Sequence, residues 1–318
     1  KKVLMNKGLI FPGQGSQKVG MGKDLFNNFK VAKDTFRRVD DSLSQNLSKL
    51  IFEGPLDELT LTENAQPAIM TVSLALMEIL KSEFDESFKD AIFCAGHSLG
   101  EYTALAATNC LEIEEVAKLL KLRGQNMQNA LPLGQGSMAA LIGADMLKVK
   151  KLIKKIPSNL ICEIANHNSL EQIVISGDTK AIDIAIEIAK KNDIRAIKLA
   201  VSAPFHCEYM KDTAIKLENT FKYLHFKNPS IPIVSNYSAR PSNNLDDLKL
   251  SLVKQTYSTV RWYESIKFMA AEKVNLFLEI GYGNTLSNMI KRMDLNDNNK
   301  SFSISTINDI ENYLKGLR

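Results

Sequence analysis

The sequence predicts an α/β protein, in which a large subdomain with a parallel sheet carries a smaller inserted subdomain of ferredoxin-like order. Two observations predict this fold. Short apolar runs alternate with longer segments of helical periodicity along the 318 residues. After residue 136 the order of these segments changes to β-α-β-β-α-β, which is the ferredoxin-like order.

The first third of the chain supplies the beginning of the large subdomain. Its first apolar run ends at a Pro-Gly pair, and amphipathic segments follow it. A second apolar run then meets a serine-containing turn and an alanine-rich segment. The expected elements are a strand at 8–13, helices near 24–39 and 66–81, a strand at 91–96 and a helix at 101–107.

The inserted subdomain is expected between a glycine-rich entrance and a proline-containing exit. Its predicted elements are strands at 137–143, 160–166, 172–177 and 195–201 and helices at 145–156 and 179–191. A turn is expected at 166–170. The predicted boundaries are 134–202 for this subdomain and 1–133 with 203–318 for the large one, because LPLGQGS and SAPFH are expected to act as hinges.

Composition excludes several classes of function. Hydrophobic residues make up 45% of the chain, enough for a sizeable core, yet no apolar stretch approaches the roughly 20 residues that span a bilayer. The net charge of +4 is too small and dispersed for a nucleic-acid protein, although it suits an acidic protein partner. The cysteines show no paired spacing, so neither a metal site nor a disulfide framework is expected. They are Cys94, Cys110, Cys162 and Cys207.

Ser98 is the first candidate for catalysis. Gly96 and Gly100 flank it in Gly-His-Ser-Leu-Gly, between a strand-like and a helix-like segment. This is the strand-turn-helix context of the nucleophile in α/β-hydrolase-like folds, and the following helix would direct free N–H groups at a developing negative charge. The alternative is a chance match, because the pattern fixes only three of five positions.

The chain has four histidines, and His206 is the best candidate for the base of Ser98. It follows SAPF at a subdomain junction, although a capping or core histidine is the alternative. His97 adjoins the serine and is expected to line the pocket, whereas His167 and His225 are expected to be solvated loop and helix residues. An ordinary serine hydrolase places its histidine late in the chain. None follows residue 225 here, so an acceptor other than water is favoured.

Arg123 stands out because arginine is rare in this lysine-rich chain. A planar guanidinium binds a carboxylate through two hydrogen bonds, so this residue predicts recognition of a carboxylate; a surface ion pair is the alternative. The segment 11–17, FPGQGSQ, is either a simple glycine turn or a loop that places backbone N–H groups beside the serine. It lacks the GK[ST] ending of a phosphate loop.

Taken together, these residues resemble the malonyl-CoA:acyl carrier protein transacylase family, which includes the acyltransferase domains of fatty acid and polyketide synthases. The matching blocks occur in the family's order over essentially the whole chain. They are FPGQGSQ, GHSLGEY, LRGQNMQ, ANHNS with QIVISG, SAPFH and the stretch 255–262. One departure is Gly281-Tyr282-Gly283, where the family usually has Gly-Pro-Gly; it is expected to change the rigidity of that loop without touching the chemistry.

The resemblance implies a role for each matched residue. Ser98 is the acylated nucleophile, and His206 is its base, oriented by the backbone carbonyl of Gln255. Gln14 and Leu99 supply the oxyanion N–H groups. Three further residues are expected to bind substrate: Arg123 at the malonyl carboxylate, Asn166 near the mouth of the site, and Phe205 beside the malonyl α-carbon.

The resemblance also implies the reaction and its partners. Malonyl-CoA and acyl carrier protein are the expected substrates, with no cofactor, metal, nucleic acid or membrane, and a discrete monomeric enzyme of fatty acid synthesis is expected. A serine thioesterase or esterase, a polyketide acyltransferase and a non-catalytic carrier-binding subunit are the alternatives. The chain begins Lys-Lys rather than Met, so a leader is expected to be absent from it; a bacterial cytoplasm and a plastid-type stroma both remain open.

A basic docking surface for the acidic carrier protein is expected near the cleft between the two subdomains. Arg195 and Lys191 are the predicted docking residues, because they lie at the start of the strand that leads back to His206 and at the end of the helix before it. The alternative is an ordinary solvated helix end, where lysines are favoured by the helix dipole. In that case the lysines of 148–155 are the next candidates.

Overall fold

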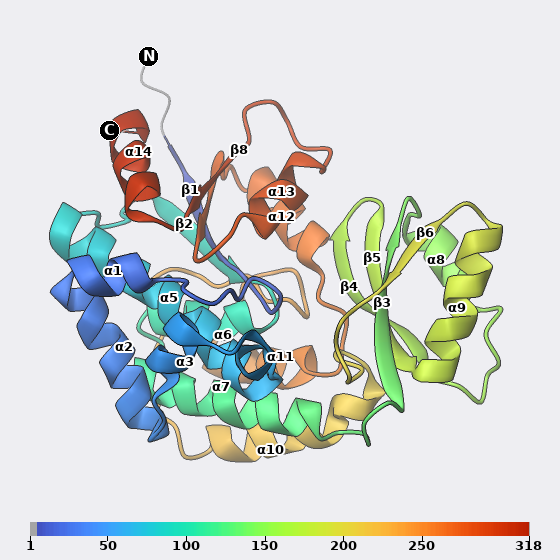
Figure 1. Cartoon of the computed structure of the whole chain (residues 1–318). Helices are drawn as coiled ribbons and strands as arrows, with labels where there is room; N and C mark the ends of the chain where they lie inside the picture. The colour runs from blue at the N-terminus through green and yellow to red at the C-terminus, as the bar shows by residue number, and fades with distance from the viewer. Residues whose placement is uncertain (1–4, 318) are drawn as a thin grey trace.

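The computed structural model describes residues 5–317 and shows a helix-covered parallel sheet with a smaller antiparallel unit beside it (Figure 1). The parallel sheet has the strand order β2-β1-β7-β8, and every neighbouring pair in it is parallel. Its strands are β1 (Lys7–Phe11), β2 (Ala91–Gly96), β7 (Leu276–Ile280) and β8 (Lys300–Ile304). The predicted mixed α/β fold is therefore confirmed.

The central strands β1 and β7 are buried along their whole length, which explains why both are mostly apolar, whereas the edge strand β8 is partly exposed and contains serines. Because side chains alternate along a strand, Leu9 and Phe11 pack against one group of helices, while Ile10 lies in a separate core with Trp262 and Leu286. The first group contains α5 (Thr62–Phe84), α6 (Leu99–Ala107) and α7 (Ile113–Gln128). The second contains α12 (Trp262–Ala271) and α13 (Thr285–Lys291).

The remaining helices surround this body. The helix predicted near 24–39 is two helices, because Phe29 has an extended backbone with φ −129° and ψ 121°. The helix predicted at 66–81 lies within the longer α5. The other helical elements are α1 (Lys23–Asn28), α2 (Lys30–Leu43), α3 (Leu47–Glu53), α4 (Leu56–Thr60), a 3-10 turn (Glu208–Met210), α10 (Lys211–Phe221), α11 (Leu245–Gln255) and α14 (Ile307–Leu317).

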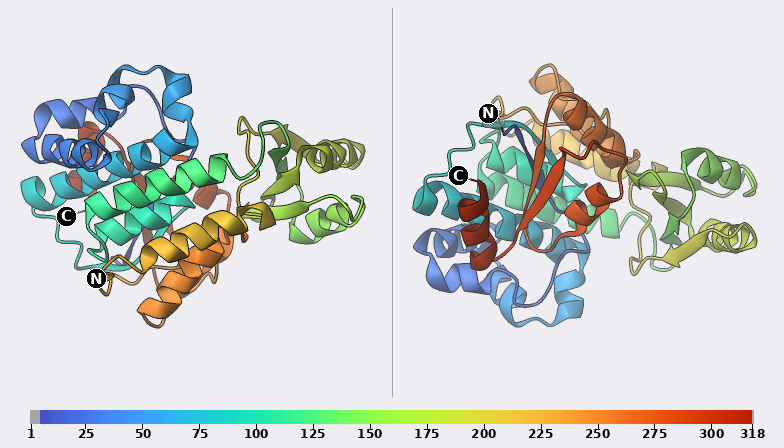
Figure 2. Two further views of the ribbon diagram at one scale, coloured as in Figure 1. Left: turned by 90° about the horizontal axis from the view of Figure 1, so that it is seen from below. Right: turned by 90° about the horizontal axis from the view of Figure 1, so that it is seen from above.

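The second sheet is antiparallel, with the order β4-β5-β3-β6, and projects from the body as a separate lobe (Figure 2). Its elements are β3 (Gly136–Ile142), α8 (Met146–Ile153), β4 (Cys162–Ser169), β5 (Gln172–Asp178), α9 (Thr179–Lys191) and β6 (Arg195–Lys198). They follow the predicted β-α-β-β-α-β order and enclose their own apolar core. All of them fall between the hinges expected from the sequence.

The turn predicted at 166–170 is wrong in its position. Strand β4 continues through Ser169, and the reversal before β5 is made by Leu170 and Glu171. The register of β4 against β5 shifts between Ile164 and Asn166 and again between His167 and Ser169, so polar residues stay in the strand through irregular pairing.

Strand β4 also joins the lobe to the body. The His167 N–H donates to the Val260 carbonyl at 2.9 Å, and the Val260 N–H donates to the Ala165 carbonyl at 2.8 Å. These bonds hold β4 beside the segment that enters α12. In the described residues 5–317, no helix is long and apolar enough to cross a membrane.

Candidate active site

The candidate nucleophile Ser98 lies on a sharp turn between β2 and α6. Its backbone has φ 56° and ψ −111°, a conformation that L-residues rarely adopt. The glycines on either side allow the turn: a Cβ on Gly96 would lie 1.8 Å from the Gly100 carbonyl carbon, and one on Gly100 would lie 2.4 Å from the Phe11 oxygen. The turn therefore exposes Ser98 at the N-terminus of α6.

His206 lies directly against Ser98, as the sequence predicted. Its Nε2 is 2.7 Å from the Ser98 Oγ, and its Nδ1 is 2.9 Å from the backbone oxygen of Gln255, the last residue of α11. A carbonyl can only accept, so Nδ1 carries the proton and Nε2 is free to accept the serine proton. Burial, and then the positive charge of Arg123, lower the pKa of His206 to about 3, which keeps the imidazole neutral.

Arg123 lies on α7 and is only 1% exposed, so the alternative of a surface ion pair is wrong. Its Nη1 donates to Gln66 Oε1 at 2.9 Å, and its Nη2 donates to Gln255 Oε1 at 2.9 Å and to the Ser98 Oγ at 3.3 Å. These partners are neutral, and burial lowers the pKa of the guanidinium. The site thus holds a buried cation whose charge is available to an anion beside Ser98.

A cavity of about 410 Å³ opens over Ser98 and lies between the parallel sheet and the lobe. It is polar near the serine and apolar on the side formed by Met127, Met138, Val174 and Val201. Eight residues selected from the sequence line it: Gln14, His97, Ser98, Leu99, Arg123, Asn166, Phe205 and His206. Gln255 is fully buried behind them.

The two expected oxyanion donors lie beside the nucleophile. Leu99 is the first residue of α6, so its N–H has no acceptor within the helix. The loop that carries Gln14 packs on the serine turn, because a Cβ on Gly13 would lie 2.6 Å from the His97 oxygen. The Gln14 side chain itself donates to Thr62 Oγ1 at 3.3 Å.

His97 links the body to the lobe at the edge of the cavity. Its Nε2 is 2.7 Å from Asn168 Oδ1 on β4, and its ring lies 5.5 Å from that of Trp262. Asn166 and Phe205 are both buried and line the same cavity. Asn168 lines it as well, although the sequence analysis did not select it.

The expectation that His167 is a solvated loop residue is wrong. His167 is a buried residue of β4, with its ring 5.0 Å from that of Tyr263 and its Nδ1 3.8 Å from Glu264 Oε1. A polar tripeptide in a short segment looks like a loop, and only the pairing with β5 and the segment before α12 makes it a strand. His225 is exposed as expected but follows α10 in a loop rather than lying in a helix.

The two predicted docking residues lie outside the cavity. Lys191 ends α9 and Arg195 begins β6, and both are exposed on the lobe. Their part in carrier binding stays a prediction.

Three further buried polar residues were not selected from the sequence. Gln66 contacts Arg123, Asn236 accepts the Ser98 N–H at 2.8 Å, and Glu101 accepts the Asn236 N–H at 2.6 Å. Burial raises the pKa of Glu101 to about 8. Glu101 adjoins the serine turn and could have been selected for its place on a buried helix. Gln66 and Asn236 become visible only where the chain brings them to the site.

The arrangement defines a serine acyl-transfer enzyme that recognises an anionic acyl group. A hydroxyl, a neutral imidazole, the first N–H of a helix and a buried guanidinium lie at one cavity. Among residues 5–317, no group of three or more His, Cys, Asp or Glu side chains is placed to hold a metal ion.

Comparison with known proteins agrees with this class. The family model described as "Acyl transferase domain" matches residues 9–306. A malonyl CoA-acyl carrier protein transacylase from Bacillus subtilis is 43% identical over 312 residues, covering 97% of this chain and 96% of the relative. One from Escherichia coli is 36% identical over 285 residues, covering 89% and 91%. The chain therefore belongs to the malonyl CoA-acyl carrier protein transacylase family of acyltransferases.

Solved structures give the same result. An acyl-carrier-protein S-malonyltransferase from Bartonella henselae is 42% identical with a TM-score of 0.94, covering 98% of this chain and 99% of that one. A malonyl-transacylase solved in complex with its type II polyketide acyl-carrier protein is 34% identical with a TM-score of 0.92, covering 98% and 99%.

Proposed function

We propose that this protein transfers the malonyl group from malonyl-CoA to the phosphopantetheine thiol of acyl carrier protein. One observation carries the proposal. The Ser98 hydroxyl lies 2.7 Å from a neutral imidazole and 3.3 Å from a buried guanidinium. A nucleophile activated beside a fixed cation suits a thioester whose acyl group ends in a carboxylate.

In the first half-reaction, His206 Nε2 takes the proton of Ser98 as the Oγ attacks the thioester carbonyl of malonyl-CoA. The resulting oxyanion accepts hydrogen bonds from the Leu99 and Gln14 N–H groups. The C–S bond breaks as the tetrahedral intermediate collapses, and His206 returns the proton to the CoA thiolate. The products are CoA and a malonyl ester of Ser98.

In the second half-reaction, the phosphopantetheine thiol of the carrier protein attacks this ester. His206 Nε2 takes the thiol proton and then passes it to the Ser98 oxygen as the C–O bond breaks. The backbone oxygen of Gln255 holds Nδ1 throughout and stabilises the imidazolium formed in each step. Malonyl-carrier protein leaves, and the free serine is restored.

Selectivity follows from Arg123. A malonyl carboxylate pairs with its charge, whereas an acetyl group leaves the buried guanidinium without a counter-ion. Phe205 lies on the cavity wall and limits the space beside the malonyl α-carbon.

The partner and the setting follow from the relatives. One related malonyl-transacylase was solved with its acyl-carrier protein bound. The named relatives from Bacillus subtilis and Escherichia coli are bacterial, which supports a bacterial cytoplasm and a role in fatty acid synthesis for this protein. It is proposed to act as a monomer, without a cofactor.

The replacement Ser98→Ala tests the proposal. Intact-mass measurement after mixing with malonyl-CoA is expected to show one added malonyl group on the parent protein and none on the variant. The thermal midpoint is expected to stay within a few degrees, because the replacement removes one hydroxyl. Malonylation of the variant would remove Ser98 from the mechanism. Rapid release of CoA without carrier protein would indicate a thioesterase instead.

A further inference from the structure

The geometry points to Asn236 as a positioning residue that, together with the side chain of Gln255, fixes the backbone on both sides of Ser98 and so aims the Leu99 N–H into the cavity. This inference rests on the proposed acylation of Ser98. Asn236 is fully buried and lies behind the turn rather than on the cavity wall, so it acts on the reaction through the backbone of the nucleophile.

The peptide before Ser98 is held at both ends. The Ser98 N–H donates to Asn236 Oδ1 at 2.8 Å, and the His97 oxygen of the same peptide accepts from the Gly100 N–H at 2.9 Å. The Ser98 N–H is therefore occupied on the side away from the substrate.

The peptide after Ser98 is held through its carbonyl. The Ser98 oxygen accepts from Gln255 Nε2 at 2.8 Å and from the Glu101 N–H at 3.1 Å. In a trans peptide the C=O and N–H point in opposite directions. Fixing the Ser98 oxygen therefore directs the Leu99 N–H away from Gln255.

The two amide side chains support each other. Gln255 Nε2 also donates to Asn236 Oδ1 at 3.3 Å. Asn236 Oδ1 therefore accepts from the Ser98 N–H and from the same Gln255 amide group that donates to the Ser98 carbonyl. Together the two amides stabilise the uncommon φ of 56° at Ser98. Without Asn236, the serine N–H would be a buried donor with no acceptor on that side.

Asn236 is itself held rigidly. Its side-chain Nδ2 donates to the Gly96 backbone oxygen at 2.7 Å. Its backbone N–H donates to Glu101 Oε1 at 2.6 Å, and its backbone oxygen accepts from the backbone N–H of Arg261 at 2.9 Å. The polar groups of Asn236 thus form hydrogen bonds either with the turn that carries Ser98 or with residues packed around that turn.

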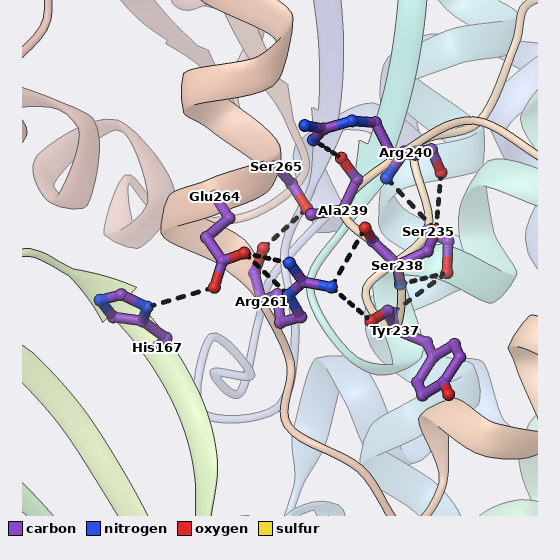
Figure 3. A network of polar contacts seen from close by, with 9 residues as sticks. All are labelled: His167, Ser235, Tyr237, Ser238, Ala239, Arg240, Arg261, Glu264 and Ser265. Atoms are coloured by element: carbon purple, nitrogen blue, oxygen red, sulfur yellow. Dashed lines mark hydrogen bonds and ion pairs between the residues drawn. The ribbon is translucent and has the colours of Figure 1, made fainter. Parts of the chain in front are cut away.

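Arg261 also holds the segment 237–238 that directly follows Asn236 (Figure 3). The guanidinium donates to the Tyr237 oxygen at 3.3 Å and to the Ser238 oxygen at 3.2 Å, and it pairs with Glu264. Ser235 holds the same segment, because its Oγ accepts from the Tyr237 N–H at 3.1 Å. Asn236 therefore has little freedom to follow a displaced serine.

The test compares Asn236→Ala with Ser235→Ala, a matched control. Ser235 is buried next to Asn236 and bonds its own turn without touching Ser98. With malonyl-CoA in a rapid-quench assay, Asn236→Ala is expected to slow serine malonylation about 100-fold, as expected for a misplaced oxyanion donor, with KM within about threefold. Ser235→Ala is expected to keep the rate within about threefold.

A second variant separates positioning from packing. In Asn236→Asp the buried carboxyl, when protonated, can accept from the Ser98 N–H and donate to the Gly96 oxygen, as the amide does. Its malonylation rate is expected to approach the parent rate at low pH and to fall as the pH rises and the carboxyl ionises. The parent protein shares Glu101 with the variant but lacks the new carboxyl, so the ratio of the variant rate to the parent rate is expected to fall as the pH rises.

Four results would overturn the inference: a rate within threefold of the parent in folded Asn236→Ala, an equal loss in Ser235→Ala, a loss confined to KM, or an Asn236→Asp profile parallel to that of the parent. If Asn236→Ala does not fold, Asn236→Ser takes its place with the same expected loss. Failure of the parent protein itself to become malonylated would instead contradict the proposed function.

Discussion

His206 and Arg123 share one buried pocket, and the cation changes the acid-base behaviour of the imidazole. Burial and Arg123 lower the pKa of His206 to about 3, and a base must be neutral to act. Because the folded-state pKa is lowered, the neutral form persists as the pH falls through the ordinary histidine value of about 6.5.

This shift predicts the pH profile of acylation. We expect kcat/KM for malonyl-CoA to stay within about twofold between pH 7.5 and 5.5, because this parameter reports the free enzyme. In Arg123→Ala the cation that lowers the pKa of His206 is gone. The loss of kcat/KM on the acidic side of the pH profile is therefore expected at a higher pH than in the parent. An inflection near pH 6.5 in the parent would contradict the prediction.

Arg123 also predicts a change of substrate preference. Arg123→Ala is expected to lower kcat/KM for malonyl-CoA by about 10- to 100-fold, the equivalent of a lost charged hydrogen bond of about 1.5–3 kcal/mol. Relative to malonyl-CoA, acetyl-CoA is expected to improve, because no unpaired guanidinium remains. Arg123→Lys should restore only part of the loss, since lysine lacks the planar fork. If kcat/KM falls by the same factor for malonyl-CoA and acetyl-CoA, Arg123 has only a structural role.

At the level of elements, the position of Arg123 depends on how closely α7 approaches α5. A Cβ on Gly124 would lie 2.6 Å from the Thr62 oxygen and 2.7 Å from the Glu63 Cα, so only glycine allows this approach. The same principle holds at Gly281, whose φ is 152° and whose added Cβ would lie 2.5 Å from the Pro12 Cγ. Gly281-Tyr282-Gly283 thus keeps the glycine that the packing requires at 281, and Gly283 has a φ of 93°, which also favours glycine.

Gly124→Ala is expected to destabilise the protein by about 1–3 kcal/mol through overpacking and to raise KM for malonyl-CoA as α7 shifts Arg123. Gly316→Ala is the control, because its Cβ on α14 would meet no atom within 4 Å. It is expected to leave KM unchanged and to stabilise the helix slightly. Thermal unfolding and steady-state kinetics measure both effects. Equal behaviour of the two variants would contradict the role of close packing.

At the level of the whole molecule, the lobe carries the predicted docking residues for an acidic carrier protein. Reversing Lys191 and Arg195 to Glu is expected to raise KM for the carrier protein several-fold while sparing serine malonylation by malonyl-CoA. High salt is expected to slow the carrier half-reaction of the parent, since the Debye length is about 8 Å at physiological ionic strength. Lys222→Glu is the matched control, because Lys222 is exposed on the body directly after α10.

If neither half-reaction changes, the Lys191 and Arg195 surface is an ordinary solvated face. The docking surface would then be sought among the lysines of 148–155 around α8.

The sequence by itself determined the order of the elements in the inserted lobe and selected Ser98, Arg123 and His206, which line one cavity, but it did not predict the strands β7 and β8 of the parallel sheet. Local signals were sufficient for the selected residues, because Gly96 and Gly100 mark a sharp turn, and a helical Arg123 amid lysines marks an unusual cation. Periodicity also separated strands from helices through most of the lobe. It failed at β4, where only pairing with other segments keeps His167 in a strand.

Only the tertiary structure decided how the site is held together. Gln66, Asn236 and Gln255 come from three distant segments, and their amides meet around Arg123 and Ser98. The sequence pattern of an amide residue does not reveal its partners, because its hydrogen bonds depend on which distant segments pack around it. The same packing buries His206 and lowers its pKa, since desolvation is a property of the folded surroundings rather than of the residue.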